Sequence, residues 1–505
     1  MTVTTSPFSE RPLSREPAAS SHPGADERPP NIVFIITDQQ RFDTIAALGY
    51  DHVDTPNLDR LVNEGTTFTR TYVSAPSCSP SRSSLFTGVY PHTLGVLRNE
   101  DLWQHSWVEL LAEAGYRCTN VGKMHTAPWE SPIGFHDRTV VENKDRDHPS
   151  VPFYHDQWDK ALWSHGLRKP TRTVHREEPE YRERLGAFEW TLPDDMHSDN
   201  FVGAHARWWL ESYPGTEPFF LQVGFPGPHP PYDPVSRHLD AYRDRDVPLP
   251  VRTPEDLASQ PTALKELRAH HQANDHDSVV HLADPTDEQS RRQRRHYYAN
   301  ITQIDEQVGL LMEALEARKA LDDTVIIFTS DHGDCLGDHG HSQKWTMYEP
   351  SVRVPAIIWG PGRRIQPGQR VEALTAMMDL GPTVLELAGI TPPPWMEAQS
   401  LLPALRGAEW LGRTHVFSEH AKDLILTGTE LMTMVRGDRW KYVEFVDSDE
   451  GQLFDLATDP NEERSLWDSP PESAAGAVRA ELRDVISRWR ALSALHTANF
   501  RRHVR

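Results

Sequence analysis

The stretch Ser77-Cys78-Ser79-Pro80-Ser81-Arg82 is the part of the chain around which the predicted fold is organised. Pro80 fits the first position of a helix, where a missing N–H group costs nothing, and Ser79 is placed to cap that helix. Cys78 would then lie at the helix N-terminus, where backbone N–H groups favour anions, and Arg82 adds a full positive charge. A thiol in this position is either a small buried hydrophobic group, which is the commoner case for cysteine, or a reactive group.

Length and charge exclude several classes of protein. With 505 residues, the chain is long enough for two or three domains. Its formal net charge of −22 argues against binding to the phosphate backbone of nucleic acids. An anionic substrate must therefore be attracted by a local positive pocket. No apolar run reaches the length of a membrane span, so we expect neither nucleic acid nor a membrane as a partner.

The cysteines and the N-terminus favour a cytoplasmic protein. Three cysteines, Cys78, Cys118 and Cys335, are too few to indicate a disulfide framework. Residues 1–30 lack the apolar segment of a signal peptide and are rich in Pro, Ser, Glu and Arg, which predicts a disordered tail.

Two buried strands that end in polar residues predict an open α/β sheet. Asn31–Thr37 is a continuous apolar run of the kind found in parallel sheets, and Asp38 and Gln39 follow it directly. A second such run, which begins at Thr324, ends at Asp331 and His332. Open α/β sheets place their functional residues at the carboxyl ends of the strands, so we expect these four side chains in one site.

Further polar residues follow other predicted strands. Lys123 and His125 come after the strand 116–121, and His229 follows the strand 219–225. Taken singly, each residue has an ordinary alternative: most lysines are solvated, most of the 26 histidines must lie outside any site, and the aspartates fit helix caps equally well. If the sheet is parallel, these side chains converge on the cysteine-bearing segment.

Apolar residues that recur every three or four positions predict helices. The predicted helices are residues 56–64, 106–114, about 199–211, about 287–319 and about 377–387. Ser106 and Glu109 are expected to form a capping box at the start of the second. Residues 126–197 and 230–285 show weak periodicity and are predicted to be loops and insertions over the site.

The pattern changes at about residue 412. Short alternating strands at 431–435 and 440–445 are separated by turn residues, which predicts a small antiparallel sheet. We therefore divide the chain into a tail (1–30), a catalytic α/β domain (31–411) and a C-terminal subdomain (412–505).

Three motifs of this sequence resemble those of the type I sulfatases. Cys78-Ser-Pro-Ser-Arg-x-x-Leu-x-Thr-Gly88 matches the family signature, in which the cysteine is oxidised to formylglycine. Gly-Tyr-x-x-x-x-x-Gly-Lys-x-His at 115–125 matches the second signature, and Leu-Phe-Asp-Leu-x-x-Asp-Pro at 453–460 is also similar. The resemblance extends from about residue 31 to 360. It implies an alkaline-phosphatase-like sandwich, with a large mixed, mostly parallel sheet flanked by helices and a small C-terminal antiparallel sheet.

The resemblance also implies a metal site. Its ligands would be Asp38, Gln39, Asp331, His332 and the oxygen of the modified Cys78. Many sulfatases have Asp-Asp where this chain has Asp38-Gln39, and Asn where it has His332. The version in this chain is similar to choline sulfatases and phosphonate monoester hydrolases. Calcium prefers oxygen ligands whereas imidazole suits manganese, so we expect one divalent ion, either Ca²⁺ or Mn²⁺.

The family mechanism assigns the remaining polar residues. One hydroxyl of hydrated formylglycine attacks sulfur, with Arg82 favouring its ionised form and Lys123 holding sulfate oxygens. His229 or Lys344 protonates the departing alcohol. His125 then takes the proton of the second hydroxyl, and the diol collapses to the aldehyde and expels sulfate. The expected partners are a small organic sulfate ester and a formylglycine-generating enzyme, and the sequence allows a homo-oligomer.

Two alternatives remain open from the sequence. A phosphonate monoester or phosphodiester hydrolase would use the same cysteine and metal ligands, but such enzymes carry uncharged hydroxyl residues where this chain has Lys123 and His125. A binding protein with an unmodified cysteine would still hold a metal and an anion. The leaving alcohol is not predicted. Residues near the site that could line its pocket are Asn99, Trp103, Trp129, Trp158 and Trp345.

Overall fold

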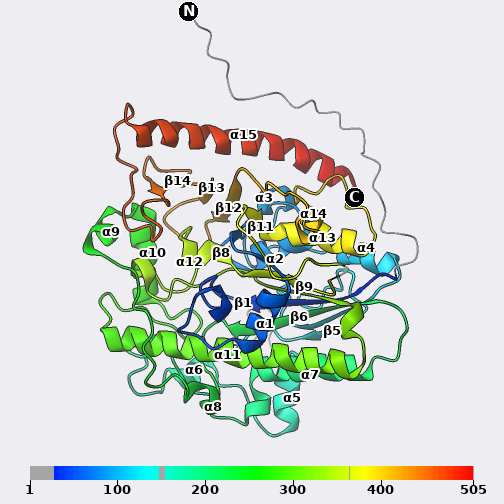
Figure 1. Cartoon of the computed structure of the whole chain (residues 1–505). Helices are drawn as coiled ribbons and strands as arrows, with labels where there is room; N and C mark the ends of the chain where they lie inside the picture. Colours follow the sequence, from blue (N-terminus) through cyan, green and yellow to red (C-terminus); the bar gives the residue numbers. More distant parts are fainter. Residues whose placement is uncertain (1–27, 147–153, 363, 504–505) are drawn as a thin grey trace, which may run out of the picture.

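An eight-stranded sheet with helices on both faces forms the centre of the molecule (Figure 1). The computed structural model describes residues 28–146, 154–362 and 364–503. The strands, in spatial order, are β10 (Gln369–Val371), β2 (Thr66–Phe68), β9 (Ala356–Trp359), β7 (Thr324–Ser330), β1 (Asn31–Asp38), β6 (Phe219–Pro228), β4 (Arg117–Gly122) and β5 (Asp137–Val140). The strands from β7 to β5 are mutually parallel, whereas β9 runs antiparallel to β7. The predicted mixed, mostly parallel sheet is confirmed.

Strand β1 is apolar from Ile32 to Ile36 because both of its faces are covered. Ile32 and Phe34 belong to the hydrophobic core on one side of the sheet, and Val33 and Ile35 belong to the core on the other. Successive side chains of a strand point to opposite faces, so a central strand between two helical layers needs no polar face. This explains why the continuous apolar run from Asn31 could be recognised as a buried strand.

The two helical layers pack against opposite faces of this sheet (Figure 1). One layer contains α2 (Cys78–Thr87), α4 (Val108–Glu113) and α13 (Leu380–Leu387), whose apolar side chains join the core around Ile32. The other layer contains α1 (Pro56–Glu64), α7 (Ser198–Ser212) and α11 (Asp287–Ala317), which join the core around Val33.

The C-terminal part contains a four-stranded antiparallel sheet, as predicted, and a long helix that was not predicted. The sheet consists of β12 (Val416–Ala421), β13 (Leu431–Arg436), β14 (Trp440–Phe445) and β15 (Gly451–Asp455). The helix, α15 (Ala474–His503), lies across this sheet and α3 (Pro91–Leu94), as the red ribbon in Figure 1 shows. A third, short sheet has three strands, in the order β11 (Thr375–Ala376), β3 (Thr71–Tyr72) and β8 (Arg353–Val354).

Two predicted helix starts are wrong. Helix α2 begins at Cys78 itself, two residues before the predicted start, because the amide oxygen of Asn99 accepts the Ser79 N–H and replaces the predicted serine cap. Helix α4 begins at Val108 without a capping box, because the Ser106 hydroxyl donates to the Ile133 carbonyl and accepts the Val108 N–H.

The predicted loops contain short helices. Residues 126–197 include α5 (Gln157–Ser164) and α6 (Arg172–His175), and residues 230–285 include α8 (Ser236–Leu239), α9 (Pro254–Ser259) and α10 (Thr262–Ala273). Most of these helices span one or two turns, which is too short for a hydrophobic period to be recognised. Two more helices of one turn are α12 (Glu349–Val352) and α14 (Leu402–Leu405).

Two predictions remain open. The predicted tail lies outside the described residues except for residues 28–30, and the boundary at 411/412 stays a prediction. Across the described ranges, none of the helices combines the length and the apolar character that crossing a bilayer requires.

Candidate active site

The ends of β1 and β7 bring two carboxylates together. The register pairs Thr37 with Ser330, so Asp38 and Asp331 follow neighbouring strand ends on the same edge of the sheet. Gln39 has a φ of 73°, which turns the chain after β1, and its backbone N–H donates to Asp331 Oδ1 over 3.0 Å. The strand pattern in the sequence therefore located both aspartates correctly.

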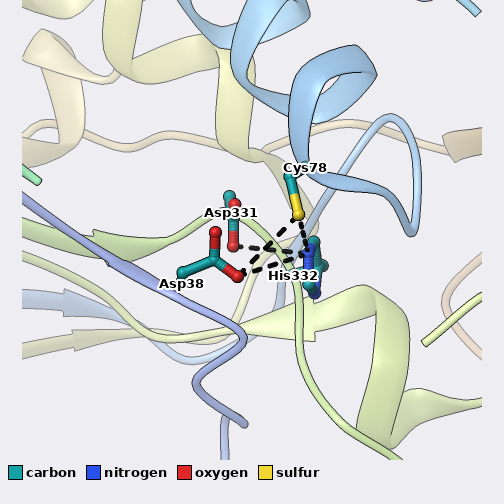
Figure 2. Close-up of side chains that lie close together, drawn as sticks. All are labelled: Asp38, Cys78, Asp331 and His332. Carbon is teal, nitrogen blue, oxygen red and sulfur yellow. Dashed lines mark hydrogen bonds and ion pairs between the residues drawn. The ribbon is translucent and has the colours of Figure 1, made fainter. Parts of the chain in front are cut away.

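Cys78 and His332 complete a buried cluster with these aspartates (Figure 2). One ligand atom from each of Asp38, Cys78, Asp331 and His332 lies within 4.8 Å of the others. The Cys78 Sγ is 3.2 Å from His332 Nε2 and 3.8 Å from Asp38 Oδ1. His332 Nδ1 lies 3.0 Å from the Gly333 carbonyl, which can only accept, so Nδ1 carries a proton and Nε2 faces the cluster. Two carboxylates and an imidazole fit a divalent ion that tolerates a nitrogen ligand.

Three cationic side chains surround the cluster. Arg82 donates from Nε to Asp331 Oδ2 over 2.7 Å, and its Nη2 lies 3.3 Å from Asp38 Oδ2. Lys123 Nζ lies 2.7 Å from the same Asp38 oxygen. Lys344 Nζ lies 3.1 Å from Cys78 Sγ. The chain thus builds a local positive pocket within a molecule whose formal net charge is −22.

These charges act on the protonation of the cluster. Burial and the Asp38 carboxylate would raise the pKa of the Cys78 thiol, but Lys344 and Lys123 outweigh them and lower it to about 6. Burial would also raise the pKa of Asp38, yet Lys123 and other cations hold it well below its usual value. A side chain at position 78 is therefore stabilised in its anionic form.

Gln39 contacts this site through both ends of its amide. Its Nε2 donates to Asp334 Oδ2 over 2.6 Å, and its Oε1 accepts from Lys344 Nζ over 3.0 Å. Tyr232 donates to the same Asp334 oxygen over 2.7 Å. Asp334 was not singled out from the sequence, because it lies in a loop with no periodicity to mark it.

The two remaining predicted histidines lie close to the cationic groups. His125 is charge-coupled to Lys123, its backbone N–H donates to Glu142 Oε1 over 3.0 Å, and its ring Nδ1 has no partner among the described residues. His229 is buried, and Lys344 is the charge that acts on it most strongly. Among the described residues, neither ring forms a hydrogen bond with Cys78.

Of the residues that the sequence suggested for a substrate pocket, some lie beside the site and others lie in the hydrophobic core. Asn99 binds Ser77 and Ser79 at the start of α2, so its amide holds the helix that carries Cys78. Trp103 and Trp158 are core residues. Trp345 lies beside the site, with Lys344 Nζ 5.3 Å from its ring centre. Trp129 packs edge-on against Tyr154.

Buried carboxylates and an imidazole beside three cations, at the edge of a mostly parallel sheet, form a site suited to hydrolysis of an anionic ester, and the relatives below place this site in the alkaline phosphatase superfamily. The chain belongs to the sulfatase family: the family profile "Sulfatase" matches residues 30–390. A second profile, "N-sulphoglucosamine sulphohydrolase, C-terminal", matches residues 337–491. The protein is therefore a sulfuric ester hydrolase.

Curated relatives span nearly the whole chain. An arylsulfatase of Clostridium perfringens is 29% identical over 456 residues, which are 87% of this chain and 90% of the relative. A choline-sulfatase of Rhizobium meliloti is 32% identical over 470 residues, which are 90% of this chain and 86% of the relative. Among solved structures, the phosphonate monoester hydrolase of Agrobacterium radiobacter superposes with a TM-score of 0.78 at 27% identity and covers 92% of this chain and 96% of its own.

Proposed function

We propose that the protein hydrolyses a small organic sulfate monoester to an alcohol and inorganic sulfate through a formylglycine made from Cys78. The observation that carries this proposal is the position of Cys78 Sγ, which lies within ligand distance of a metal-type cluster and 3.1 Å from a lysine. Arylsulfatase and choline-sulfatase relatives support a sulfate substrate.

Asp38, Gln39, Asp331 and His332, with residue 78, would hold one divalent ion, Ca²⁺ or Mn²⁺. Such an ion would supply Lewis-acid stabilisation of negative charge on the oxygen atoms around sulfur, and formylglycine would supply a hydrated aldehyde with two hydroxyl groups. The donor set fits this ion because two buried carboxylates and a correctly oriented imidazole Nε2 face one point. A formylglycine-generating enzyme is then a required partner.

The cations of the site would bind the sulfate group and offset its charge. Lys123 and Arg82 approach from the side of Asp38 and Asp331, and Lys344 approaches the side chain at position 78. All three are buried, and charge–charge interactions are stronger in a site that excludes water. They are therefore placed to stabilise the additional negative charge of the transition state.

His125 and His229 would move protons on opposite sides of the reaction. Burial, together with Lys123, lowers the pKa of His125 to about 3, so its ring is neutral at physiological pH and its free Nδ1 can accept a proton. This fits the proposed base for the release of sulfate. His229 lies beside Lys344 on the proposed leaving-group side, where one of the two protonates the alcohol.

Mass spectrometry and metal reconstitution test the proposal together. The peptide that contains residue 78 should carry an aldehyde in protein matured in its native host. The same preparation should hydrolyse aryl sulfates, lose this activity on chelation and regain it with Mn²⁺ or Ca²⁺. A retained thiol in a preparation without hydrolysis would instead indicate a binding protein.

A phosphonate monoester hydrolase is the alternative that a specific observation favours. Two such enzymes superpose on this chain, with TM-scores of 0.78 and 0.75 at 27% and 26% identity. Lys123 and His125 nevertheless favour sulfate, since the family resemblance implies uncharged hydroxyl residues at these positions in phosphonate monoester hydrolases. Comparing turnover of an aryl sulfate with that of an aryl phosphonate monoester distinguishes the two functions. A large preference for the phosphonate would favour the phosphonate monoester hydrolase.

The cysteines bear on localisation. All three are free and buried, which supports the expectation of a reducing compartment such as the cytoplasm. Fractionation of native cells would test this expectation.

A further inference from the structure

A tight turn from the insertion between β6 and α11 reaches the active site. His276 and Val279 form an isolated antiparallel bridge, and Asp277 and Ser278 are the two residues between them. Their φ angles are 53° and 60°. Turns with two left-handed residues usually use Asn-Gly or Asp-Gly, so a serine in the second position is unfavourable. Strained turns of this kind persist where the surrounding contacts hold them, and they are frequent at functional sites.

The tip of this turn is a buried carboxylate directed at a predicted catalytic histidine. Asp277 is 4% exposed, and its Oδ2 lies 3.6 Å from His229 Nε2. Its Oδ1 lies 2.7 Å from Arg146 Nη1 and 3.6 Å from Arg172 Nη2. The two arginines bind one oxygen of the carboxylate and leave the other facing the imidazole.

The tautomer of His229 identifies the nitrogen that exchanges protons. Its Nδ1 lies 2.8 Å from the Pro230 carbonyl, which can only accept a hydrogen bond, so Nδ1 carries a proton. Lys144 holds the backbone of the loop that carries His229, because its Nζ donates to the carbonyls of His229 and Pro231. Nε2 is therefore the atom that gains or loses a proton, and it is the atom that faces Asp277.

The other charges around His229 oppose its protonated form more than they support it. Burial lowers its pKa well below the usual value, and Lys344 and Lys123 lower it further. Asp277 and Asp38 act in the opposite direction. Without Asp277, the imidazolium would be buried beside two ammonium groups and compensated by Asp38 alone among these groups. An acid that must donate a proton needs this compensation.

We propose that Asp277 is a positioning residue for departure of the alcohol: its carboxylate faces His229 Nε2 and stabilises the imidazolium form that donates the proton. The inference rests on the proposed function and deepens it, since it selects His229 over Lys344 as the acid. In the proposed reaction, an oxygen of a formylglycine at position 78 would bond to sulfur while the bond between sulfur and the alcohol oxygen breaks and its electron pair stays on the alcohol oxygen. The oxygen takes the Nε2 proton, and the neutral imidazole is later reprotonated from water.

The substitution Asp277→Asn removes the charge and keeps both the shape and the tolerance for a left-handed φ. Its effect should depend on the leaving group. With 4-nitrophenyl sulfate, whose phenolate departs readily, kcat/KM should fall less than about threefold. With phenyl sulfate, which needs a proton, it should fall about ten- to a hundredfold, less than the roughly 10²–10⁴-fold contribution of a general acid, because the histidine itself is retained. His229→Ala should show the same leaving-group dependence, and adding Asp277→Asn to it should cause no further loss.

Asp275, two residues before Asp277, provides a matched control beside the turn. It pairs with Arg176 over 2.6 Å and accepts from Tyr181 over 3.0 Å, away from His229. Asp275→Asn should leave the dependence on the leaving group unchanged. An equal loss for all substrates in both variants would show a purely structural role and overturn the inference.

A second variant guards against misfolding. Asp277→Gly also suits the positive φ, so a charge-free turn can be tested if the asparagine variant is insoluble. An active wild-type enzyme with no leaving-group effect in either variant overturns this inference alone. A wild-type enzyme that matures to the aldehyde but hydrolyses no sulfate ester overturns the proposed function as well.

Discussion

Position 78 combines a helix start with a cation in direct contact with the side chain. The side chain belongs to the first residue of α2, which Asn99 holds by accepting the Ser79 N–H over 3.1 Å. Lys344 lies on its other side, at 3.1 Å from the sulfur. The helix N-terminus and the lysine both favour negative charge on the same atom. A group at this position is therefore prepared to act as an anion.

Cys78→Ser should abolish turnover. A serine at position 78 has one hydroxyl group, so it cannot release sulfate by collapse of a geminal diol, and steady-state hydrolysis should fall at least about a thousandfold. The assay is hydrolysis of an aryl sulfate by the purified variant, with circular dichroism as the control for folding. Retention of more than a tenth of the wild-type rate would exclude the formylglycine mechanism.

His332→Asn should shift the metal preference. Replacing an imidazole nitrogen by an amide oxygen favours calcium over manganese, because calcium binds oxygen ligands. We expect the ratio of activities restored by Mn²⁺ and Ca²⁺ after chelation to fall about tenfold or more, a change typical of altered ligand environments. An unchanged ratio would mean that His332 does not bind the ion. Substitution of the nearby buried His341, which bonds Gln260, serves as the control.

The residues of the site were predictable to different degrees. Asp38, Asp331 and His332 follow apolar strands, so the pattern alone located them. Asp277 could not be found in this way, because it lies in a polar insertion and its position depends on ion pairs with Arg146 and Arg172. Such long-range contacts leave no local periodicity in the sequence.

At the scale of elements, the central strands were predictable from the sequence, whereas helix α15 was not predicted. A strand buried on both faces is visible as an apolar run, whereas a helix that lies on the surface of another sheet shows only one apolar stripe. Its stripe contains Val478, Leu482, Ile486 and Trp489, which recur every three or four residues. The sequence therefore contains the signal of this helix, and the prediction of an antiparallel sheet alone for the C-terminal part does not account for it.

Trp489 should be the main anchor of α15. Its ring stacks on Phe417 at 4.4 Å between ring centres and meets Tyr90 edge-on at 5.0 Å. Trp489→Ala should destabilise the protein by about 3 kcal/mol, the usual cost of deleting a large buried aromatic side chain. Urea unfolding measures the effect. Leu495 on the same helix is 65% exposed, so Leu495→Ala should change stability by less than about 0.5 kcal/mol.

The packing of α15 through Trp489 should depend on pH, because His92 contacts this tryptophan. Its Nδ1 lies 2.7 Å from Glu419 Oε1, and although burial lowers the pKa of His92, the hydrogen bond and charge of Glu419 raise it above the usual value. A raised pKa means that this stabilisation is complete below about pH 6.5 and is lost as pH rises through the pKa of the folded state. His92 also meets the Trp489 ring at 4.9 Å, so the docking of α15 is affected.

His92→Gln tests this dependence. The variant should be less stable than the wild type by about 1 kcal/mol at pH 6, and the difference should shrink by pH 9. Urea midpoints at the two pH values measure it. A difference that grows with pH would contradict the assigned direction of the pKa shift.

For the molecule as a whole, the charge of the site is opposite to that of the surface. The formal net charge is −22, yet three buried cations stand against the two carboxylates of Asp38 and Asp331. Substrate anions are therefore bound by a small positive region inside an acidic molecule. The carboxylates are also paired with cations of the chain itself, as Arg82 bridges both of them.

Chelation should therefore remove activity without unfolding the protein. The two aspartates keep their partners Arg82 and Lys123, so no uncompensated buried charge remains when a divalent ion leaves. The strands that carry them are held by two independent cores. We expect aryl sulfate hydrolysis to fall more than about a hundredfold and the midpoint of thermal unfolding to fall by only a few degrees, since ligand binding at a hundred times Kd contributes about 2.7 kcal/mol. Loss of the folded circular dichroism spectrum on chelation would show that the ion is structural, and full activity in the chelated protein would exclude a role for it in the reaction.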